Sequence, residues 1–367
     1  MRTVGVEEEL LLVSATTGEP LAVSSAVLAS AAGSGDEDAR EVFEAELHQE
    51  MLEFATRPVR DMRALRQEIV RWRGEAAHHA EAAGARVAAL ATSPLPVEPS
   101  RSLGRRYRWM AEQFALTTEE QLTCGCHVHV SVESDEEGVA VLDRIRPWLA
   151  LLIAISGNSP FWSGRDSGYC SYRSRVWNRW PSAGAYESFG SAEHYHERVR
   201  DMVATGVLHD TGMIYFDARL AQNYPTVEIR VADVCLEADT TVLVATLVRG
   251  LVDTAARAWR NGEPPARVPV SLLRLASWRA ARSGLPGPLL DPRTLREVPA
   301  DAALDALLEH VDEALRANGD RDDAHRALAE LRARGTGAQR QRELHEAGLD
   351  LGEVVRECAR ITTSATA

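Results

Sequence analysis

The segment 3–12 combines the β-branched and aliphatic residues of a strand with three consecutive carboxylates, Glu7, Glu8 and Glu9. Because alternate residues of an extended chain share a face, Glu7 and Glu9 project together, while the two valines and Leu10 line the opposite face. Two like charges this close repel each other unless something positive lies between them. The segment therefore predicts a strand whose polar face meets either arginine or a divalent metal ion. It leaves Glu8 on the apolar side without an evident partner.

A second segment, predicted as a strand at 122–132, carries two histidines. His127 and His129 share one face, whereas Cys124 and Cys126 share the other face with the valines. The spacing resembles a zinc motif, but ligands on opposite faces of a strand cannot converge on one tetrahedral ion. We therefore expect the cysteines in the core. The histidine pair is interpreted either as two surface histidines or as part of a site.

A third segment, 225–234, repeats this division, with Glu228 and Arg230 on one face and aliphatic residues on the other. Alternation alone does not separate a solvated ion pair, which contributes little to stability, from a functional site. If the three strands lie in one sheet, its polar face combines carboxylates, imidazoles and a guanidinium. Oxygen-rich ligands with an occasional imidazole suit Mg²⁺ or Mn²⁺ rather than zinc. Mg²⁺ held in this way bridges to the phosphates of ATP in many enzymes.

The charged residues exclude several partners and catalytic groups. The formal net charge of −13 argues against nucleic acid or an anionic membrane as a partner. All 41 basic residues are arginine, which excludes a phosphate-loop lysine, a Schiff-base lysine and a lysine general base. Any phosphate must therefore be held by arginine, backbone amides or metal.

The chain has features of a cytoplasmic protein. Its five cysteines are an odd number without the spacing of a secreted disulfide framework, which indicates reduced thiols. No signal peptide is evident, because a strand is predicted directly after Met1. The longest apolar runs, such as 148–156, are shorter than the ~20 residues of a membrane helix.

The order of the elements predicts an α+β fold with a mainly antiparallel sheet. We expect one catalytic domain over residues 1–367, with a mixed core at about 1–262 and a helical part at about 263–367. Segment 43–56 predicts a bent strand or a hairpin, with a short helix as the competing interpretation. Further strands are predicted at 87–91 and 212–220, and helices are predicted at 61–84, 103–116, 135–157, 191–205, 238–260, 269–282, 301–317, 321–333 and 350–360.

Residues 158–190 form a predicted loop that is too long for a simple connection. It contains four arginines that could clamp phosphate or carboxylate, Arg165, Arg173, Arg175 and Arg179. Its aromatic residues could close over a substrate: Trp162, Tyr169, Tyr172, Trp177 and Trp180. The competing interpretation is a surface flap in which arginines stack on aromatic rings.

Several motifs together resemble the bacterial carboxylate–amine ligases, the glutamate–cysteine ligase type 2 family. The matching segments are 5–10, 126–130, 158–162, 226–230, 272–292 and 335–342. The resemblance implies the catalytic fold of glutamine synthetase, in which a curved, mainly antiparallel sheet forms a funnel, with flanking helices and here a helical C-terminal third.

The resemblance also implies roles for particular residues. It implies a metal site formed by Glu7, Glu9, Glu46, Glu53, His127 and Glu228. It implies that Arg173 and Arg230 face the phosphates of ATP and act in catalysis. It implies that the substrate is held by Tyr215, Arg219, Arg106 and His129.

The implied reaction uses ATP and Mg²⁺ or Mn²⁺. ATP phosphorylates a carboxylate, by analogy the γ-carboxylate of glutamate, and an amine attacks the acyl phosphate to give an amide. The partners are thus a small-molecule acid and an amine; a homodimer is left open. Two other functions also fit the residues: a guanidino or carboxylate kinase on the same fold, and a non-catalytic metal- or nucleotide-binding protein.

Overall fold

The computed structural model describes residues 1–35 and 37–364 and is built around one antiparallel sheet. The strand order is β2-β3-β1-β5-β9-β8, and β4 also pairs with β1. These strands are β1 (Val4–Ser14), β2 (Phe43–Ala45), β3 (Met51–Ala55), β4 (Ala85–Ala88), β5 (Gly125–Ser131), β8 (Ala218–Leu220) and β9 (Thr226–Asp233). The three strands predicted to share a sheet, β1, β5 and β9, are direct neighbours, and the hairpin interpretation of 43–56 is confirmed.

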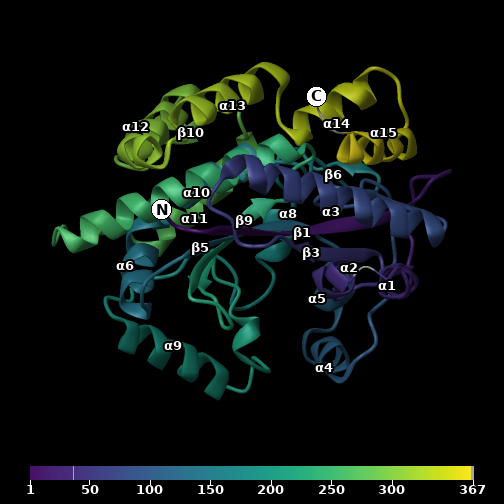
Figure 1. The fold of residues 1–367 in the computed structure, drawn as a ribbon, viewed down its shortest axis with the longest axis horizontal. Coiled ribbons are helices and arrows are strands. Elements are labelled where there is room, and N and C mark those ends of the chain that lie inside the picture. The colour runs from purple at the N-terminus through teal and green to yellow at the C-terminus, as the bar shows by residue number, and fades with distance from the viewer. Residues whose placement is uncertain (36, 365–367) are drawn as a thin grey trace.

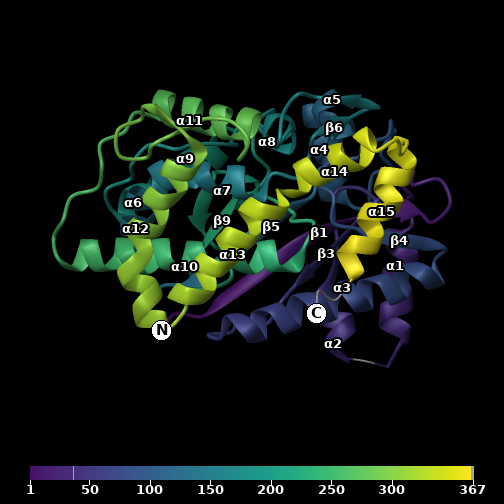
Figure 2. The same ribbon diagram turned by 90° about the horizontal axis from the view of Figure 1, so that it is seen from above.

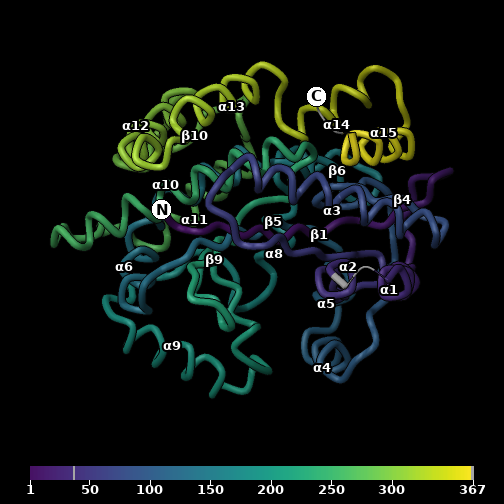
Figure 3. The backbone as a smooth tube through the Cα atoms, viewed as in Figure 1, coloured from purple at the N-terminus to yellow at the C-terminus, as the bar shows by residue number. Residues whose placement is uncertain are grey.

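Helices cover the apolar face of the sheet. Two long helices, α3 (Met62–Ala82) and α10 (Ala238–Arg260), lie against it, and β1 crosses the middle of the molecule beneath them (Figures 1 and 3). The side chain of Asp61 caps α3 by accepting from the amide of Arg63, as the sequence predicts. On the other side of the sheet lie α4 (Arg105–Phe114) and α9 (Ala192–Ala204) (Figure 1).

The C-terminal helices form a further layer, which Figure 2 shows from above; its first two helices pack on α10, and its last helix packs on α3 and β4. The helices of this layer are α12 (Ala300–Asn318), α13 (Arg321–Arg334), α14 (Gly337–Glu346) and α15 (Leu351–Thr363). The remaining helices are α1 (Ser24–Gly33), α2 (Glu37–Val42), α5 (Leu116–Glu119), α6 (Asp135–Ile145), η1 (Arg146–Trp148), α7 (Leu149–Ser156), α8 (Arg173–Trp177), η2 (Thr211–Met213) and α11 (Val270–Ser283). Two short hairpins complete the described chain, β6 (Phe161–Trp162) with β7 (Arg165–Asp166) and β10 (Leu289–Leu290) with β11 (Glu297–Val298).

Glu8 forms a buried ion pair with a helix that covers the sheet. Its carboxylate accepts two hydrogen bonds from the guanidinium of Arg73 on α3, both at 2.8 Å, and one from Thr241 on α10 at 2.6 Å. Both members of the ion pair are buried. The alternation of β1 therefore holds without a bulge at this position. Glu8 joins the sheet to α3 and α10 through these hydrogen bonds.

Some predicted elements differ from the structure. The strand expected at 212–220 is reduced to β8, because the segment before it turns through η2 and its carbonyls at Gly212 and Ile214 accept from Arg219. The helix expected at 135–157 divides at η1, which contains Pro147. Helices α1, α2, α8 and α14 were not predicted; α1 has almost no amphipathic pattern, α2 and α8 are short, and α14 is strongly polar, so packing on the core decides them.

Candidate active site

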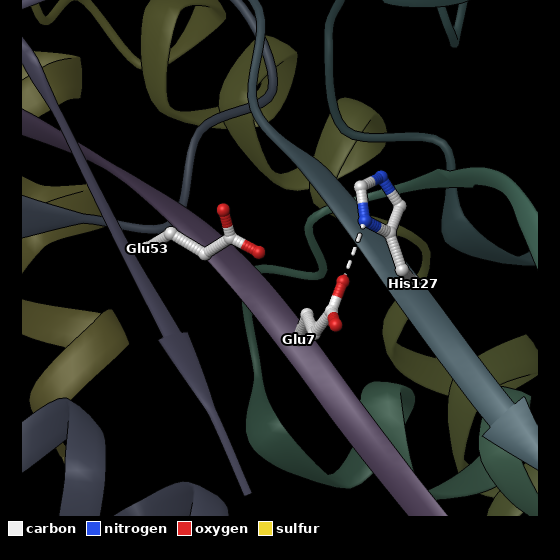
Figure 4. Close-up of side chains that lie close together, drawn as sticks. All are labelled: Glu7, Glu53 and His127. Carbon is white, nitrogen blue, oxygen red and sulfur yellow. Dashed lines mark hydrogen bonds and ion pairs between the residues drawn. The ribbon is translucent and has the colours of Figure 1, made fainter. Parts of the chain in front are cut away.

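Strand pairing brings the predicted polar residues together. Glu7 of β1 lies opposite His127 of β5, and Glu9 lies opposite Glu53 of β3. Figure 4 shows Glu7, Glu53 and His127 projecting from three neighbouring strands on the same side, with Glu7 Oε2 3.1 Å from His127 Nδ1. The polar face therefore follows from alternation along each strand together with the register between strands.

These side chains form three overlapping groups in which the potential ligand atoms lie within 4.8 Å of one another. The groups are Glu7–Glu53–His127, Glu7–His129–Glu228 and Glu9–Glu46–Glu53. All six residues predicted to bind metal belong to at least one group, and His129 joins them. Among the described residues, none of the groups includes a cysteine, and all five cysteines are buried and free. The predicted position of the cysteines in the core is confirmed, while the metal-binding roles stay predictions.

Negative charge accumulates at one end of this cluster. Burial and the neighbouring Glu46 carboxylate hold the pKa of Glu53 well above its ordinary value. Burial also raises the pKa of Glu9, although His127 and the amide of Gly125 oppose this. Burial would likewise raise the pKa of Glu7, but hydrogen bonds from His127 and His129 outweigh it and lower that pKa. The carboxylates of Glu9, Glu46 and Glu53 are therefore the part of the cluster with the greatest need for a cation.

Glu228 has a different environment, because two arginines already neutralise it. Arg219 donates to both of its oxygens, at 2.7 and 3.2 Å, and Arg230 is also hydrogen-bonded to it. Burial would raise the pKa of Glu228, but the two guanidinium charges lower it instead. Arg219 also donates to two backbone carbonyls, so four of its five N–H donors are used within the protein. The substrate-binding role of Arg219 and the metal-binding role of Glu228 stay predictions.

A cavity of about 220 Å³ lies over the carboxylate cluster. The predicted site residues that line it are Glu7, Glu9, Glu46, Glu53, Arg106, His127, Tyr215, Arg219 and Arg230. Three predicted site residues lie outside this lining: His129, Arg173 and Glu228. His129 is held between the hydroxyl of Thr226 and Glu7, at 3.0 and 3.1 Å. The geometry therefore places His129 closer to the carboxylates than to the open cavity.

The sequence analysis did not predict three polar residues of the cavity wall: Tyr107, Gln121 and Thr123. Gln121 and Thr123 precede β5 in the same alternation that carries His127, so extending that alternation backwards would have found them. Tyr107 lies on α4, and nothing in its local sequence distinguishes it from the other aromatic residues of that helix.

The loop 158–190 is fixed to the sheet by Asp233 at the end of β9. Its buried carboxylate accepts from the amide of Asn158 at 2.9 Å and from the hydroxyls of Ser159 and Ser171 at 2.7 and 2.8 Å. Ser159 in turn accepts from the amide of Arg173 at 2.9 Å. The start of α8 is therefore anchored to the strand that carries Glu228 and Arg230.

The four arginines of this loop do not converge. Arg165 and Arg179 are exposed, and Arg179 pairs with Glu120. Arg173 is only 2 % exposed and lies against β5, where a Cβ at Gly125 would be 2.2 Å from its Nη2. The surface-flap interpretation is therefore wrong for Arg173. It holds in one respect, since Arg173 lies over the ring of Trp177, with 5.5 Å between the guanidinium carbon and the ring centroid.

Comparison with known proteins identifies the family. The family model described as "Glutamate-cysteine ligase family 2" matches residues 3–360. The chain belongs to this family. A Streptomyces avermitilis protein named "Putative glutamate--cysteine ligase 2-1" is 65% identical over 99% of both chains. A Streptomyces coelicolor protein named "Putative glutamate--cysteine ligase 2" is 62% identical over the full length of both.

Solved structures of distant sequence share the fold. The glutamate–cysteine ligase of Francisella tularensis, solved in complex with AMP, is similar with a TM-score of 0.73 at 13% identity, over 100% of this chain and 89% of that one. A bifunctional glutathione synthetase from Pasteurella multocida has a TM-score of 0.67 at 14% identity, covering 99% of this chain and 52% of that one. The predicted α+β fold with its antiparallel sheet is thereby confirmed. In the described part of the chain, no helix has the length and apolar content needed to cross a membrane.

Proposed function

We propose that the protein is an ATP-dependent carboxylate–amine ligase that forms an amide through an acyl phosphate, with the γ-carboxylate of glutamate as the acid. The observation that carries the proposal is that clustered carboxylates and the buried Arg230 line one cavity, with the buried guanidinium of Arg173 against β5 beside it. Phosphoryl transfer requires both: cation-binding groups for the metal–nucleotide complex and guanidinium groups for the transferring phosphate. The names of the relatives support glutamate as the acid and cysteine as the amine.

The donor set fits a divalent cation. Carboxylate oxygens with one or two imidazoles are ligands that Mg²⁺ and Mn²⁺ accept. The Nε2 atom of His127 is buried without a hydrogen-bond partner among the described residues, as expected for a ligand atom. We propose that Glu7, Glu9, Glu46, Glu53, His127 and Glu228 supply the ligands for divalent ions, divided among the three groups. When bound, such an ion would neutralise phosphate oxygens and lower the charge barrier to transfer.

The protein's own residues then account for the two chemical steps. In the first, an oxygen of the substrate carboxylate attacks the γ-phosphorus of ATP, and ADP leaves. In the second, the amine nitrogen attacks the acyl carbon, loses a proton, and phosphate leaves. Arg173 and Arg230 stabilise the charge on the phosphoryl oxygens in the first step. No protein nucleophile is required, which agrees with a chain that contains no lysine.

The cavity walls position the acid and exclude water. Arg106 and Tyr215 line the cavity and are proposed to bind the substrate, whose α-carboxylate suits a guanidinium. Arg219 and His129 are proposed to act here mainly by holding Glu228 and Glu7. The rings of Trp177 and Trp180 pack on Tyr215, with centroids 4.9 and 5.7 Å apart, and close one side of the cavity. Excluding water protects the acyl phosphate from hydrolysis.

We further propose that residues 1–367 work as one catalytic domain in the cytoplasm. Helices α12 and α13 pack on α10, α15 packs on α3 and β4, and Gln341 of α14 donates to Asn158 of the loop that carries Arg173. The buried free thiols of all five cysteines suit a reducing compartment.

The proposal is tested by measuring ADP release from Mg-ATP and glutamate across a panel of amino acids and amines, with product masses recorded. We expect amine-dependent ADP release and a product whose mass equals acid plus amine minus water. Glu53→Gln should abolish turnover, whereas Glu330→Gln, an exposed carboxylate on α13, should not. A phosphorylated product that persists without an amine would indicate the kinase instead. No turnover with any pairing would refute the ligase.

A further inference from the structure

Helix α4 forms part of the wall of the cavity over the carboxylate cluster. It contributes Arg106, Tyr107 and Met110 to the cavity lining, and Figure 1 shows it on the side of the sheet opposite to α3 and α10. Among the helices and strands of the described chain, only α5 packs closely against it. Met110 is the only buried residue of α4. A helix with so few buried contacts belongs to the parts of a protein that open at low cost in free energy.

The segment that carries α4 is anchored on both sides of the helix to the same neighbouring stretch of chain. Before the helix, the buried Ser102 donates through its amide to the carbonyl of Leu47 at 2.9 Å and through its hydroxyl to the carbonyl of Glu46. After the helix, the carbonyl of the buried Thr118 lies 3.1 Å from Nε2 of His48. The helix therefore spans two fixed points.

Unusual backbone conformations lie just inside these two anchors. Gly104 has φ 154° and ψ 155°, a region that is almost restricted to glycine. Ala115 has φ 45° and ψ −122°, which is strained for a residue with a Cβ. Such positions at the ends of an element can absorb the change of a hinge motion. Thr118 also donates to the carbonyl of Met110 at 3.0 Å, so the N-terminal half of α4, with Arg106, is the part that is free to move.

Three contacts, all partly exposed, hold this N-terminal half in place. The Nε atom of Arg106 donates to Asp210 at 3.2 Å, and each of the two side chains is 40% exposed. The other two contacts are the edge-to-face packing of Trp109 on His209, with 5.1 Å between ring centroids, and a 3.2 Å hydrogen bond from the hydroxyl of Tyr107 to the carbonyl of Ala45. Exposed ion pairs of this kind are weak, so the arrangement can open. Asp210 uses only Nε of Arg106, which leaves the Nη donors directed by this contact but not consumed by it.

We propose that α4 is a lid on the cavity over the carboxylate cluster, and that Asp210 is a positioning residue that holds the lid shut through Arg106. With α4 in its present position the cavity is about 220 Å³, below the about 300–1,000 Å³ of pockets for drug-sized ligands. Opening the lid admits substrates, and closing it excludes water from the reacting groups. The motion itself does not depend on the proposed function; only its consequence for catalysis rests on the ligase reaction.

The test measures the position of the lid by double electron–electron resonance between two nitroxide labels on the full chain. One label is attached at Arg105→Cys, exposed at the start of α4, and the other at Val207→Cys, 40% exposed. All five native cysteines are buried, so the labels react with the introduced thiols. A second pair that omits the lid, Val207→Cys with Leu275→Cys on α11, is the reference and should give one distance that no lid variant changes.

We expect two distances for the lid pair, one for the closed and a longer one for the open position. Asp210→Asn should raise the ratio of the open to the closed population about two- to fivefold, as expected for the loss of an exposed ion pair. Exchanging the two charges, with Arg106→Asp and Asp210→Arg in one chain, should restore the original ratio because the ion pair is rebuilt. Asp305→Asn, which removes an exposed ion pair with Arg332 at 2.8 Å, should leave the ratio unchanged.

Two results would overturn the lid. One is a single distance for the lid pair in both the otherwise unmodified chain and Asp210→Asn. The other is a ratio that Asp210→Asn does not change.

The catalytic role of Asp210 has a separate readout. In Asp210→Asn, ADP release should exceed amide formation, because water reaches the acyl phosphate when the lid opens more often. Asp210→Glu, which keeps the charge, should restore most of the coupling between the two. A purely structural role would lower both rates in step, and this result would refute the positioning role. An inactive ligase leaves the distance measurements standing, whereas an active ligase with a single lid distance refutes only the lid.

Discussion

Replacing Glu53 by glutamine should stabilise the metal-free protein and weaken its binding of Mg²⁺. Glu53 is buried and shares one potential ligand group with Glu9 and Glu46 and another with Glu7 and His127. Full charges 4.8 Å apart repel by about 3.5 kcal/mol at an effective dielectric constant of 20. Protonation relieves part of this repulsion, so the expected gain for Glu53→Gln in EDTA is smaller, about 1–3 kcal/mol.

Mg²⁺ should stabilise the unmodified protein more than Glu53→Gln and so remove most or all of the stability advantage of the variant. A ligand at 100 times its dissociation constant stabilises the folded state by about 2.7 kcal/mol, and only the unmodified protein retains the full donor set. The assay is urea unfolding at pH 8, once in EDTA and once in saturating Mg²⁺. Glu330→Gln, an exposed carboxylate on α13 without a hydrogen-bond partner among the described residues, is the control and should change neither curve.

Two results would refute this reasoning. If Glu53→Gln is destabilising in EDTA, the carboxylates are not in mutual repulsion, and the cluster is stabilised by hydrogen bonds between protonated carboxyl groups. If Mg²⁺ stabilises both proteins equally, Glu53 does not contribute to a metal site.

Three further predictions follow from single contacts. Gly125→Ala should lower kcat with the fold retained, because the new Cβ would be 2.2 Å from Nη2 of Arg173. The control is Gly74→Ala, because no atom lies within 4 Å of a Cβ at that position. Equal kcat values for the two variants would contradict the assigned position of Arg173. Glu8→Gln should lower the free energy of unfolding in urea by about 3–5 kcal/mol, because it leaves Arg73 buried and charged without its partner. A loss below about 1 kcal/mol would argue against the buried ion pair. Burial lowers the pKa of His310 to about 4 from 6.5, so its contribution to stability is complete above pH 6.5 and is lost as the pH falls towards 4. His310→Asn should therefore reduce the fall of Tm between pH 6.5 and pH 4. The remaining fall includes the contribution of His48, whose pKa is also lowered to about 4 by burial. An unchanged dependence of Tm on pH in His310→Asn would contradict this role of His310.

The sequence predicted the sheet and its polar face because both depend on local alternation. In β1, β5 and β9 every second residue faces the same way, so Glu7, His127 and Glu228 could be grouped before any contact was known. The register that brings Glu9 opposite Glu53 depends on pairing across 44 positions, 53 minus 9, and was not predicted; only the family resemblance assigned Glu53 to the site.

Contacts between distant segments were not predictable in this way. Glu8 is 65 residues from Arg73, and nothing near either residue specifies the other. The burial of Arg173 depends on the absence of a side chain at Gly125, and the loop that carries it is held by Asp233. The family resemblance assigned Arg219 to the substrate, whereas in the structure it donates to Glu228 and to two backbone carbonyls. Each of these features arises from packing between elements.

The most direct test of the central claim follows oxygen from the acid to the phosphate. Glutamate labelled with ¹⁸O in its γ-carboxylate is incubated with Mg-ATP and an amine that supports turnover, and the released phosphate is analysed by mass spectrometry. An acyl phosphate intermediate transfers one labelled oxygen to each phosphate, because the carboxylate oxygen that attacks phosphorus leaves with it. Phosphate without label, formed while the amide product accumulates, would contradict the proposed mechanism.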